Sequence, residues 1–437
     1  DASHSWRQAT VVMAARNFLE INNNILYPRI DIGGSGTGIT GMEFPLLNYL
    51  IYLVSLIFGY DHWYGRLINL IVSSFGVFYF HRIVAKHVSP AVAFNAAIIL
   101  ICSIWFAFSR KIMPDTLSIS LVLIGIYHGL VHLNDQVHRW RSLLFFTVLI
   151  ALGTLAKLPS AYMLVVVLIP FFDRKIAVSR KIQIATALLI GILPGLIWYF
   201  HWVPHLVKTY GTDHFFMGKG IGEGSIEILQ HFDLVLQRFY DSAMKYTGFI
   251  AFCAGMIIAV IKRNTLILIV LAATSFMFSI VILKAGFTFA HHSYYIIPFV
   301  PVMALIAGFA LAQIKQKKIM YVLLLVIAIE GMSSQIHRFF RKPEDRALLQ
   351  LEEDLDRISD RDDLILINSG SIPTPMYFAH RKGWVMENAS IKDPAFVASL
   401  KDEGLRLIVI LKKTIGTNTD LDLPVVMEND DYNIYRP

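Results

Sequence analysis

The stretch TLILIVLAATSFMFSIVIL, residues 265–283, contains no Lys, Arg, Asp or Glu and decides what class of protein this is. A helix needs about 20 apolar residues to cross roughly 30 Å of hydrocarbon, and this stretch approaches that length. The whole chain has the same character, because 55% of its 437 residues are hydrophobic, 16% are charged and the mean hydropathy is +0.56. A soluble domain has about 25% charged residues. The composition therefore indicates a polytopic α-helical membrane protein.

Similar apolar runs occur along most of the chain and predict about ten spans. They are Leu67–Phe80, Pro90–Ser109, Thr116–Leu133, Ser142–Ala156, Leu158–Phe172, Ile184–Phe200, Tyr246–Ile261, Thr265–Leu283, Ser293–Ile314 and Ile319–Ser334. The chain opens on Asp1, without an initiator Met and in a polar, aromatic stretch. We therefore expect a further segment before Asp1, either a signal peptide or one more membrane span.

The run Leu46–Gly59 is apolar but too short to span, since about 14 residues at 1.5 Å each cover only some 21 Å. Treating it as interfacial makes the basic clusters between the spans alternate, as the positive-inside rule requires. These clusters are His81–Lys86, His138–Arg141, Asp173–Lys181, Lys262 with Arg263, and Lys315–Lys318. The segments then predicted to be extracytoplasmic are Asp1–His62, Ser109–Asp115, His201–Lys245, Ala285–His292 and the C-terminal region.

The composition becomes charged and polar after Ser334. We divide the chain into an extracytoplasmic first loop with interfacial helices at 1–62, a transmembrane bundle at 63–334 and a small extracytoplasmic α/β domain at 335–437. Within this last domain, spacing predicts helices and buried strands. The helices are Pro343–Ile358 and Asp393–Glu403, and the strands are Leu364–Asn368 and Arg406–Leu411.

Two motifs that often carry chemistry do not do so here. The glycine-rich run Gly33–Gly41, GGSGTGITG, lacks a flanking strand and helix, which favours a flexible loop over a phosphate cradle. The cysteines Cys102 and Cys253 both lie in apolar runs, so the sequence supports neither a disulfide framework nor a thiolate zinc site.

The outer N-terminal segment holds two carboxylates, Asp1 and Glu43. A sugar transferase that uses a lipid-phosphate donor needs a carboxylate to accept the acceptor's proton and cations near the leaving phosphate. The basic residues predicted on or near the outer side are Arg7, Arg29, Arg66, Arg110, Lys111 and Lys157. Snorkelling and interfacial ion pairs are the alternative explanation for these cations, and a helix N-cap is the alternative for Asp1.

The order of these features resembles the GT-C glycosyltransferases of the protein O-mannosyltransferase and aminoarabinose transferase type, bacterial glycosyltransferase family 39. Asp1, a stretch from Thr10 to Ile21 that we expect to be an amphipathic helix, YPR at 27–29 and then EFPL at 43–46 resemble the family's first outer loop. Ala2 stands where the family often has a second acid, and Phe44 where it has a basic residue or proline. Further matches follow in order at WYGRL (63–67), MPD (113–115), LAKLP (155–159) and HSYYIIP (292–298).

The resemblance implies that Asp1 is the general base of an inverting transfer and that Glu43 holds substrate or a divalent cation. It implies contacts with the carrier phosphate or its sugar for a second set of residues. These are Arg7, Arg66, Asp115, Lys157, His292, Tyr294 and Tyr295. The expected partners are a polyprenyl-phosphate-linked sugar donor, an acceptor that is protein, lipid or glycan, and membrane lipid, without nucleic acid. The expected location is the bacterial inner (plasma) membrane.

Several histidines fall on the predicted outer side, and His214 is the candidate to bind a metal ion together with Glu43. The alternative is that these histidines are polar lining of a wet cavity.

Two other functions remain open, a secondary transporter and a non-catalytic subunit that binds the lipid carrier. Transporters place ionisable residues near the midplane and show repeated halves, and neither feature is evident here. For the enzyme, we expect Asp1 and Glu43 to meet at one cavity with at least one of Arg66, Lys157 and Tyr295.

Overall fold

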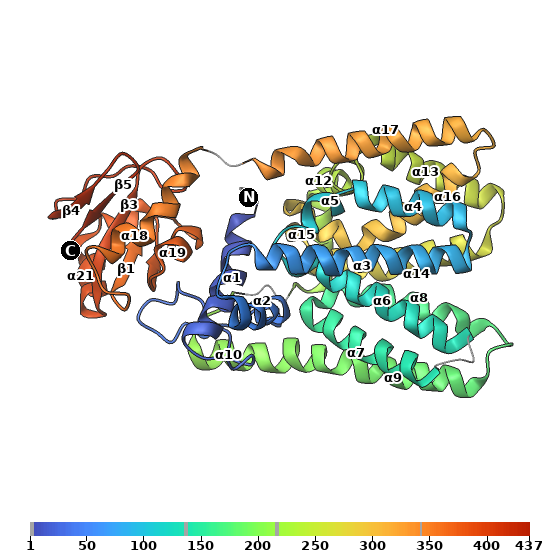
Figure 1. Ribbon diagram of the computed structural model, residues 1–437, viewed down its shortest axis with the longest axis horizontal. Coiled ribbons are helices and arrows are strands. Elements are labelled where there is room, and N and C mark those ends of the chain that lie inside the picture. Colours follow the sequence, from blue (N-terminus) through green and yellow to red (C-terminus); the bar gives the residue numbers. More distant parts are fainter. Residues whose placement is uncertain (1–3, 135–138, 215–217, 341–342) are drawn as a thin grey trace. The chain divides into compact units, whose positions relative to one another are not determined.

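The computed structural model describes residues 4–134, 139–214, 218–340 and 343–437. The chain divides into two compact units (Figure 1). The loop unit comprises Asp1–His62, Trp202–Phe215 and Arg338–Pro437, and the bundle unit comprises Trp63–His201 and Phe216–His337. The first outer loop and the C-terminal domain, which the sequence presents as separate segments, thus belong to the same compact unit.

The bundle unit is helical throughout its described residues (Figure 1). Its α-helices are α3 (Tyr64–His87), α4 (Pro90–Cys102), α5 (Trp105–Phe108), α6 (Pro114–Asn134), α7 (Arg139–Ala156), α8 (Val165–Leu168), α9 (Val178–Ile197), α11 (Ile221–Gln230), α12 (Phe232–Gln237), α13 (Lys245–Ile261), α14 (Thr265–Ala285), α15 (Phe287–His291), α16 (Val300–Ala312) and α17 (Lys317–Ile336). Its 3₁₀ segments are η1 (Leu158–Leu164), η2 (Ile169–Phe172) and η5 (Ser293–Phe299), and its π-helical segments are η3 (Trp198–Trp202) and η4 (Arg238–Ala243).

The polytopic helical architecture is confirmed, with fewer full-length spans than the sequence predicts. Among the described residues, six helical segments are long and apolar enough to cross a membrane: Tyr64–His87, Pro114–Asn134, Val178–Tyr210, Thr265–Ala285, Ser293–Ala312 and Lys317–Phe339. A seventh results if Phe232–Ala243 and Lys245–Ile261, bent by 101°, form one span. The three other predicted spans are the shorter apolar helices Pro90–Cys102, Trp140–Ala156 and Leu158–Phe172.

The run Pro90–Ser109 shows why an uncharged stretch can still break. Helix α4 ends at Cys102, and the hydroxyl of Ser103 donates to the carbonyl of Leu100 at 2.6 Å. The next amide, Ile104 N–H, donates to the Ala243 carbonyl at 2.9 Å instead of continuing the helix. Because that acceptor comes from a distant segment, hydropathy alone does not reveal the break.

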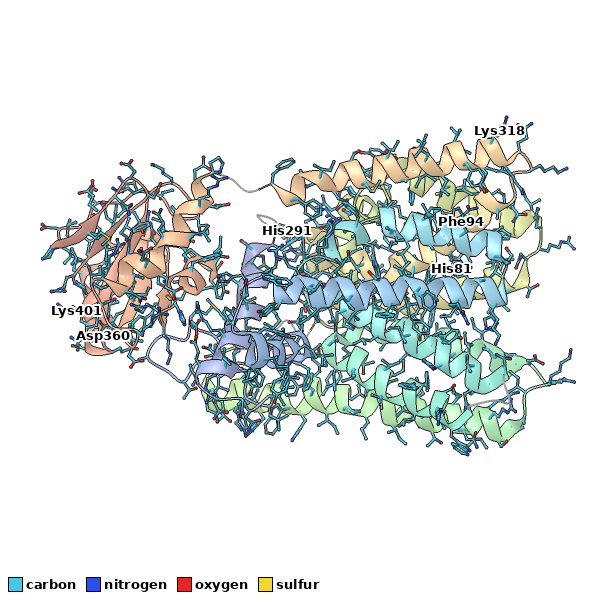
Figure 2. The ribbon with its side chains drawn as sticks, viewed as in Figure 1. His81, Phe94, His291, Lys318, Asp360 and Lys401 are labelled. Carbon is cyan, nitrogen blue, oxygen red and sulfur yellow. The ribbon has the colours of Figure 1, made fainter. Side chains whose placement is uncertain are left out.

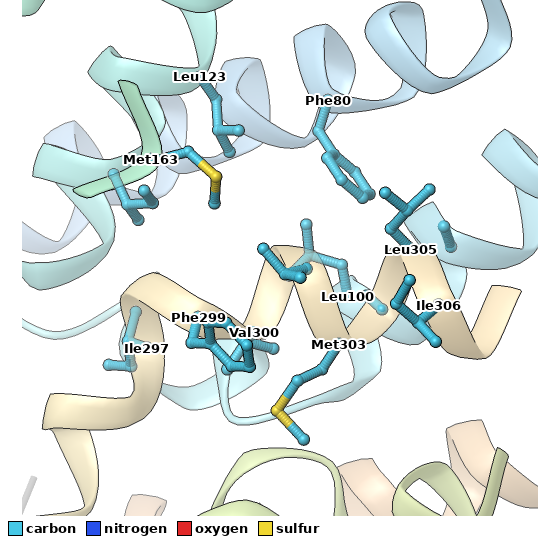
Figure 3. Close-up of a cluster of buried hydrophobic side chains, with 14 of the residues drawn as sticks. Phe80, Leu100, Leu123, Met163, Ile297, Phe299, Val300, Met303, Leu305 and Ile306 are labelled. Atoms are coloured by element: carbon cyan, nitrogen blue, oxygen red, sulfur yellow. The ribbon is translucent and has the colours of Figure 1, made fainter. Parts of the chain in front are cut away.

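Helix α16 forms the centre of the bundle, since every residue from Val300 to Leu311 is buried. Figure 3 shows Val300 and Leu305 of α16 together with Phe80 of α3, Leu123 of α6 and Met163 of η1. Lipid tails are as apolar as these side chains, so close packing rather than transfer from water holds such helices together.

A residue of a predicted basic loop and a residue of a predicted outer loop lie toward opposite ends of the bundle. Figure 2 shows Lys318 of α17 at one end and His291 of α15 toward the other. The separation agrees with the predicted alternation of basic and outer loops, while the orientation of the protein in a membrane stays a prediction.

In the loop unit, α1 (Ser5–Glu20) and α2 (Leu46–Phe58) flank the glycine-rich run, and α10 (Val203–Tyr210) packs near it. Helix α2 has 13 residues, too few to span, as predicted. Helix α1 differs from the amphipathic helix expected at 10–21. All residues from Gln8 to Phe18 are buried, the polar ones included, so α1 is an interior helix of the unit.

The C-terminal part of the loop unit is a five-stranded sheet with short helices. Its strands are β1 (Leu364–Ile367), β2 (Gly383–Val385), β3 (Leu405–Leu411), β4 (Val425–Glu428) and β5 (Tyr432–Tyr435), in the order β2-β1-β3-β5-β4. Strand β1 is parallel to β2 and β3, whereas β5 is antiparallel to β3 and β4. The helical segments are η6 (His337–Phe339), η7 (Pro343–Gln350), α18 (Leu351–Asp356), α19 (Thr374–Ala379), α20 (Asn388–Ile391) and α21 (Pro394–Asp402).

The predicted α/β character is confirmed, and the predicted strands correspond to β1 and β3. The helix expected at 393–403 is α21, whose N-cap Asp393 accepts a hydrogen bond from the Ala395 amide at 3.0 Å. Strands β2, β4 and β5, of three, four and four residues, were not predicted.

Candidate functional site

The bundle unit contains a buried ion pair between Lys157 and Asp115, two of the predicted carrier-binding residues. Asp115 lies in the first turn of α6, and Lys157 adopts an extended conformation just after α7 ends. The Lys157 ammonium bonds the Asp115 carboxylate, and their side chains are only 7% and 1% exposed. A charge buried to this degree requires a partner, and in a membrane bundle it marks a candidate functional site.

Three aromatic rings of the predicted set lie beside this pair. The Lys157 ammonium is 4.9 Å from the Tyr294 ring centre and 5.3 Å from that of Tyr295. His292 stacks on Tyr294 with 5.2 Å between ring centres. Ring faces attract cations, so the tyrosines add to the attraction that Asp115 exerts on the ammonium. Five of the predicted residues thus form one cluster, which we call the lysine cluster (Asp115, Lys157, His292, Tyr294 and Tyr295).

The turn that leads to Asp115 is fixed by Asn69, a residue that the sequence reasoning missed. Asn69 of α3 is fully buried, and its amide group donates to the carbonyls of Phe108, Lys111 and Met113 at 3.2, 2.7 and 3.2 Å. Its side-chain oxygen accepts from the hydroxyl of Thr116 at 3.1 Å. An asparagine within an otherwise apolar span was the signal that could have identified it.

Ser118 supports the other half of the pair and was also missed. Its hydroxyl lies 2.7 Å from the Gly153 carbonyl, 3.1 Å from the Lys157 carbonyl and 2.7 Å from the Ser160 hydroxyl. The backbone at Lys157 is therefore tied to the helix that carries Asp115. Tyr162 in turn donates to the Pro298 carbonyl at 2.7 Å and so anchors the tyrosine-bearing segment η5.

Three other cations that the sequence predicts on the outer side, Arg66, Arg110 and Lys111, lie in the same unit. Arg66 occupies the first turn of α3 and is partly buried. Lys111 is fully buried, with its ammonium 5.0 Å from the Phe108 ring centre. That Arg66 belongs to the lysine cluster stays a prediction.

The loop unit contains a second ion pair, between Arg7 of α1 and Glu43, which follows the glycine-rich run. Both side chains are 12% exposed. The Arg7 guanidinium also lies 5.5 Å from the Trp6 ring centre. Asp1, the predicted general base, lies outside the described residues, so its place beside this pair stays a prediction.

His214 lies close to this second pair, edge-on to Trp6 with 6.4 Å between ring centres. Burial, together with the positive charge of Arg7, lowers the pKa of His214 to about 4. The imidazole is therefore neutral at physiological pH. Its Nε2 atom is buried and has no hydrogen-bond partner among the residues that the structure describes. We call Arg7, Glu43 and His214 the arginine cluster.

The described part of the arginine cluster does not fit a divalent cation. Catalytic zinc sites have three protein ligands, whereas only Glu43 and His214 are candidates here, and the Glu43 carboxylate is ion-paired with a guanidinium. Across the ranges that the structure describes, no group of three or more His, Cys, Asp or Glu side chains could hold a metal ion. No step proposed below depends on a metal.

Residues 43–198 match the model of the dolichyl-phosphate-mannose-protein mannosyltransferase family. This segment includes Glu43, Arg66, Asp115 and Lys157. No curated protein sequence matches the chain.

The fold is similar to those of solved glycosyltransferases. ArnT from Cupriavidus metallidurans bound to undecaprenyl phosphate superposes with a TM-score of 0.64 at 11% identity, covering 98% of this chain and 93% of ArnT. The apo state of ArnT gives a TM-score of 0.59 at 12% identity, with coverage of 99% and 92%. The Archaeoglobus fulgidus oligosaccharyltransferase in complex with Zn and sulfate gives 0.58 at 10% identity, covering 93% of this chain and 63% of that enzyme. The resemblance to GT-C glycosyltransferases expected from the sequence is therefore confirmed, and the fold is of the ArnT type.

Proposed function

We propose that this protein is a membrane glycosyltransferase, because its fold is ArnT-like and residues 43–198 match a mannosyltransferase family. The enzyme moves a monosaccharide from a polyprenyl-phosphate carrier to a protein, lipid or glycan acceptor. The reaction takes place at the extracytoplasmic side of the bacterial inner membrane, where the C-terminal domain also lies. ArnT was crystallised with undecaprenyl phosphate, which supports a carrier of this class.

The observation that carries the proposal is the lysine cluster. A lysine only 7% exposed, held by an acid and two tyrosine rings inside an apolar bundle, can exchange part of its contact with Asp115 for a phosphate oxygen. The tyrosine rings offer faces on which a sugar ring can pack. Arg66, in the first turn of its span, is assigned to the same carrier phosphate.

In the proposed reaction, the Asp1 carboxylate takes the proton from the acceptor hydroxyl. The acceptor oxygen attacks the anomeric carbon while the bond from that carbon to the phosphate oxygen breaks. The electron pair leaves with the polyprenyl phosphate, whose charge Lys157 and Arg66 balance, and the anomeric configuration inverts. Glu43, held by Arg7, accepts a hydrogen bond from the substrate and so orients it.

The test uses the purified full chain, a radiolabelled polyprenyl-phosphate sugar and candidate acceptors, with mass spectrometry of the product. Loss of a positioned general base costs about 10²- to 10⁴-fold in rate, so Asp1→Asn should lower kcat by that factor while carrier binding is retained. Glu43→Gln should also lower transfer. The matched controls Asp362→Asn and Glu344→Gln change exposed acids of the C-terminal region and should leave transfer unchanged.

The two other functions predict different results in the same experiment. A non-catalytic subunit would bind the carrier without releasing a glycosylated product in the wild type. A transporter would move substrate across proteoliposomes irrespective of Asp1. Either result would overturn the proposal.

A further inference from the structure

The glycine-rich run of the first loop lies between the C-terminal domain and the arginine cluster. We call residues 31–41 the glycine clasp. Its first half is hydrogen-bonded to Gly383, the first residue of the edge strand β2. The Gly383 amide donates to the Asp31 carbonyl at 3.0 Å, and the Gly34 amide donates to the Gly383 carbonyl at 2.9 Å. The Lys382 ammonium caps the Gly36 carbonyl. The clasp is therefore joined to the domain by main-chain hydrogen bonds at Gly383 and by the Lys382 side chain.

Gly34 is required at this contact for two reasons. Its φ of +58° lies in the left-handed region, which favours glycine. A Cβ atom there would lie 2.4 Å from Nε1 of Trp384 and 2.8 Å from the next ring atom. By contrast, Gly36 has no positive φ, and its added Cβ would meet only the Gly33 carbonyl at 3.2 Å. The same loop thus offers a sensitive glycine and a tolerant one.

The second half of the clasp leads directly to the arginine cluster. The Gly41 amide donates to the Thr212 carbonyl at 3.1 Å, and the His214 amide donates to the Gly41 carbonyl at 2.9 Å. Glu43 follows only two residues later. One main-chain path therefore connects the sheet edge at Gly383 to Glu43 and His214.

A separate path connects the domain to helix α1, which carries Arg7. The Asp31 carboxylate accepts from Arg16 at 2.9 Å and from Asn17 at 2.7 Å, and both donors belong to α1. Arg16 also donates to the Tyr377 carbonyl at 3.1 Å and lies 4.8 Å from that ring centre. Arg16 and Asp31 are 4% and 7% exposed, so this bridge is buried.

We propose that the C-terminal domain positions the catalytic end of the first loop by holding the glycine clasp and α1. Gly34, Asp31 and Tyr377 are then positioning residues for the transfer reaction. The inference rests on the proposed function, because the reaction that it serves is the transfer assigned to Asp1 and Glu43. It differs from a role in choosing the acceptor, because the clasp leads to Glu43 and His214, and the second path reaches α1, the helix that carries Arg7.

The experiment compares Gly34→Ala with the matched control Gly36→Ala in the full chain. Misplacement of a reacting group by about 1 Å can cost about 10²-fold in rate, so Gly34→Ala should lower kcat at least tenfold. The carrier Kd should stay within twofold of the wild-type value. Hydrogen exchange should rise in residues 5–20 and 39–43 of Gly34→Ala only.

A milder variant keeps the test decisive should Gly34→Ala fail to fold. The Tyr377 hydroxyl lies 2.7 Å from the Tyr60 hydroxyl and 2.5 Å from Nδ1 of His62, and Tyr377→Phe removes both bonds while keeping the ring against Arg16. The Tyr60 hydroxyl also donates to the Val12 carbonyl of α1 at 3.4 Å, so loss of its Tyr377 partner should raise exchange in α1 and lower kcat severalfold.

Two results would overturn the positioning role. One is an unchanged kcat despite raised exchange in α1, and the other is a higher KM for the acceptor with kcat unchanged. A wild-type chain without any transfer would instead overturn the proposed function. In that case hydrogen exchange in Gly34→Ala, compared with Gly36→Ala, still decides whether the C-terminal domain holds α1 and the segment that contains Glu43.

Discussion

The lysine cluster and the arginine cluster are both built on a shielded ion pair, but different structures hold them. Lys157 and Asp115 are 7% and 1% exposed and are fixed by side chains of the membrane bundle itself. Arg7 and Glu43 are each 12% exposed and belong to a unit that combines irregular backbone with the five-stranded sheet of the C-terminal domain. The comparison shows that a helical bundle fixes charges through polar side chains within its spans, whereas a loop does so through main-chain bonds to a domain distant in sequence.

The largest expected effect concerns the lysine cluster. Lys157→Met leaves the Asp115 carboxylate buried without its cation, and breaking such a pair costs about 3–5 kcal/mol. The double variant Lys157→Met with Asp115→Leu removes both charges and should recover most of that loss. Unfolding in detergent measures both effects. An equally large loss of stability in Arg7→Met would contradict the contrast between the Lys157–Asp115 pair and the Arg7–Glu43 pair.

The next effect tests whether side chains hold the bundle site. Asn69→Leu has similar volume but leaves the Lys111 carbonyl without its 2.7 Å donor. A buried unsatisfied group costs about 1–3 kcal/mol, and Asn69 serves more than one, so we expect a loss of about 2–3 kcal/mol. Ser74→Ala, an exposed position of the same helix, is the control and should have little effect. An equal loss in both variants would mean that the polar contacts of Asn69 are not responsible.

The arginine cluster should make a pH-dependent contribution to stability through His214. The pKa of His214 falls from 6.5 to about 4, so between these pH values the unfolded chain binds a proton that the folded chain does not. The contribution of this histidine to stability must therefore rise with pH across this window, by about 3 kcal/mol in total. Thermal unfolding of wild type and His214→Gln at pH 4.5 and 7 measures it. The slope should become flatter in His214→Gln but not in the exposed control His205→Gln.

The smallest effect sets the baseline for exposed charges. Arg357 pairs with Glu353 and Asp354 on α18 and is 60% exposed. Exposed pairs contribute about 0–1 kcal/mol, so Arg357→Ala should change the free energy of unfolding by less than about 0.5 kcal/mol. Denaturant unfolding measures this change. A larger value would show that exposed ion pairs do not contribute less to stability than the shielded pairs of the two clusters.

The sequence identified the members of both clusters more readily than their supports. Lys157, Asp115 and Tyr294 are visible because charged and aromatic residues are conspicuous beside apolar runs. Asn69 and Ser118 were missed because a single polar residue in a span does not disclose its partner. Their acceptors lie on other helices and are brought near only by packing.

The loop unit was harder to predict, because its contacts join distant segments. Arg16 and Tyr377 are 361 positions apart in the chain but share a hydrogen bond. The glycine run indicated a loop, yet nothing in its composition identified Trp384 as the side chain that excludes a Cβ at Gly34.

The amino-acid pattern is enough to predict the membrane character, the six or seven full-length spans and the α/β nature of the C-terminal domain. These follow from hydropathy and residue spacing, which are local properties of the chain. Only the tertiary structure decided that Asp115 pairs with Lys157, that α1 is buried on every face and that the glycine clasp joins the sheet edge at β2. These depend on which donors and acceptors meet once water and lipid are excluded, and that is decided by the packing of segments far apart in the chain.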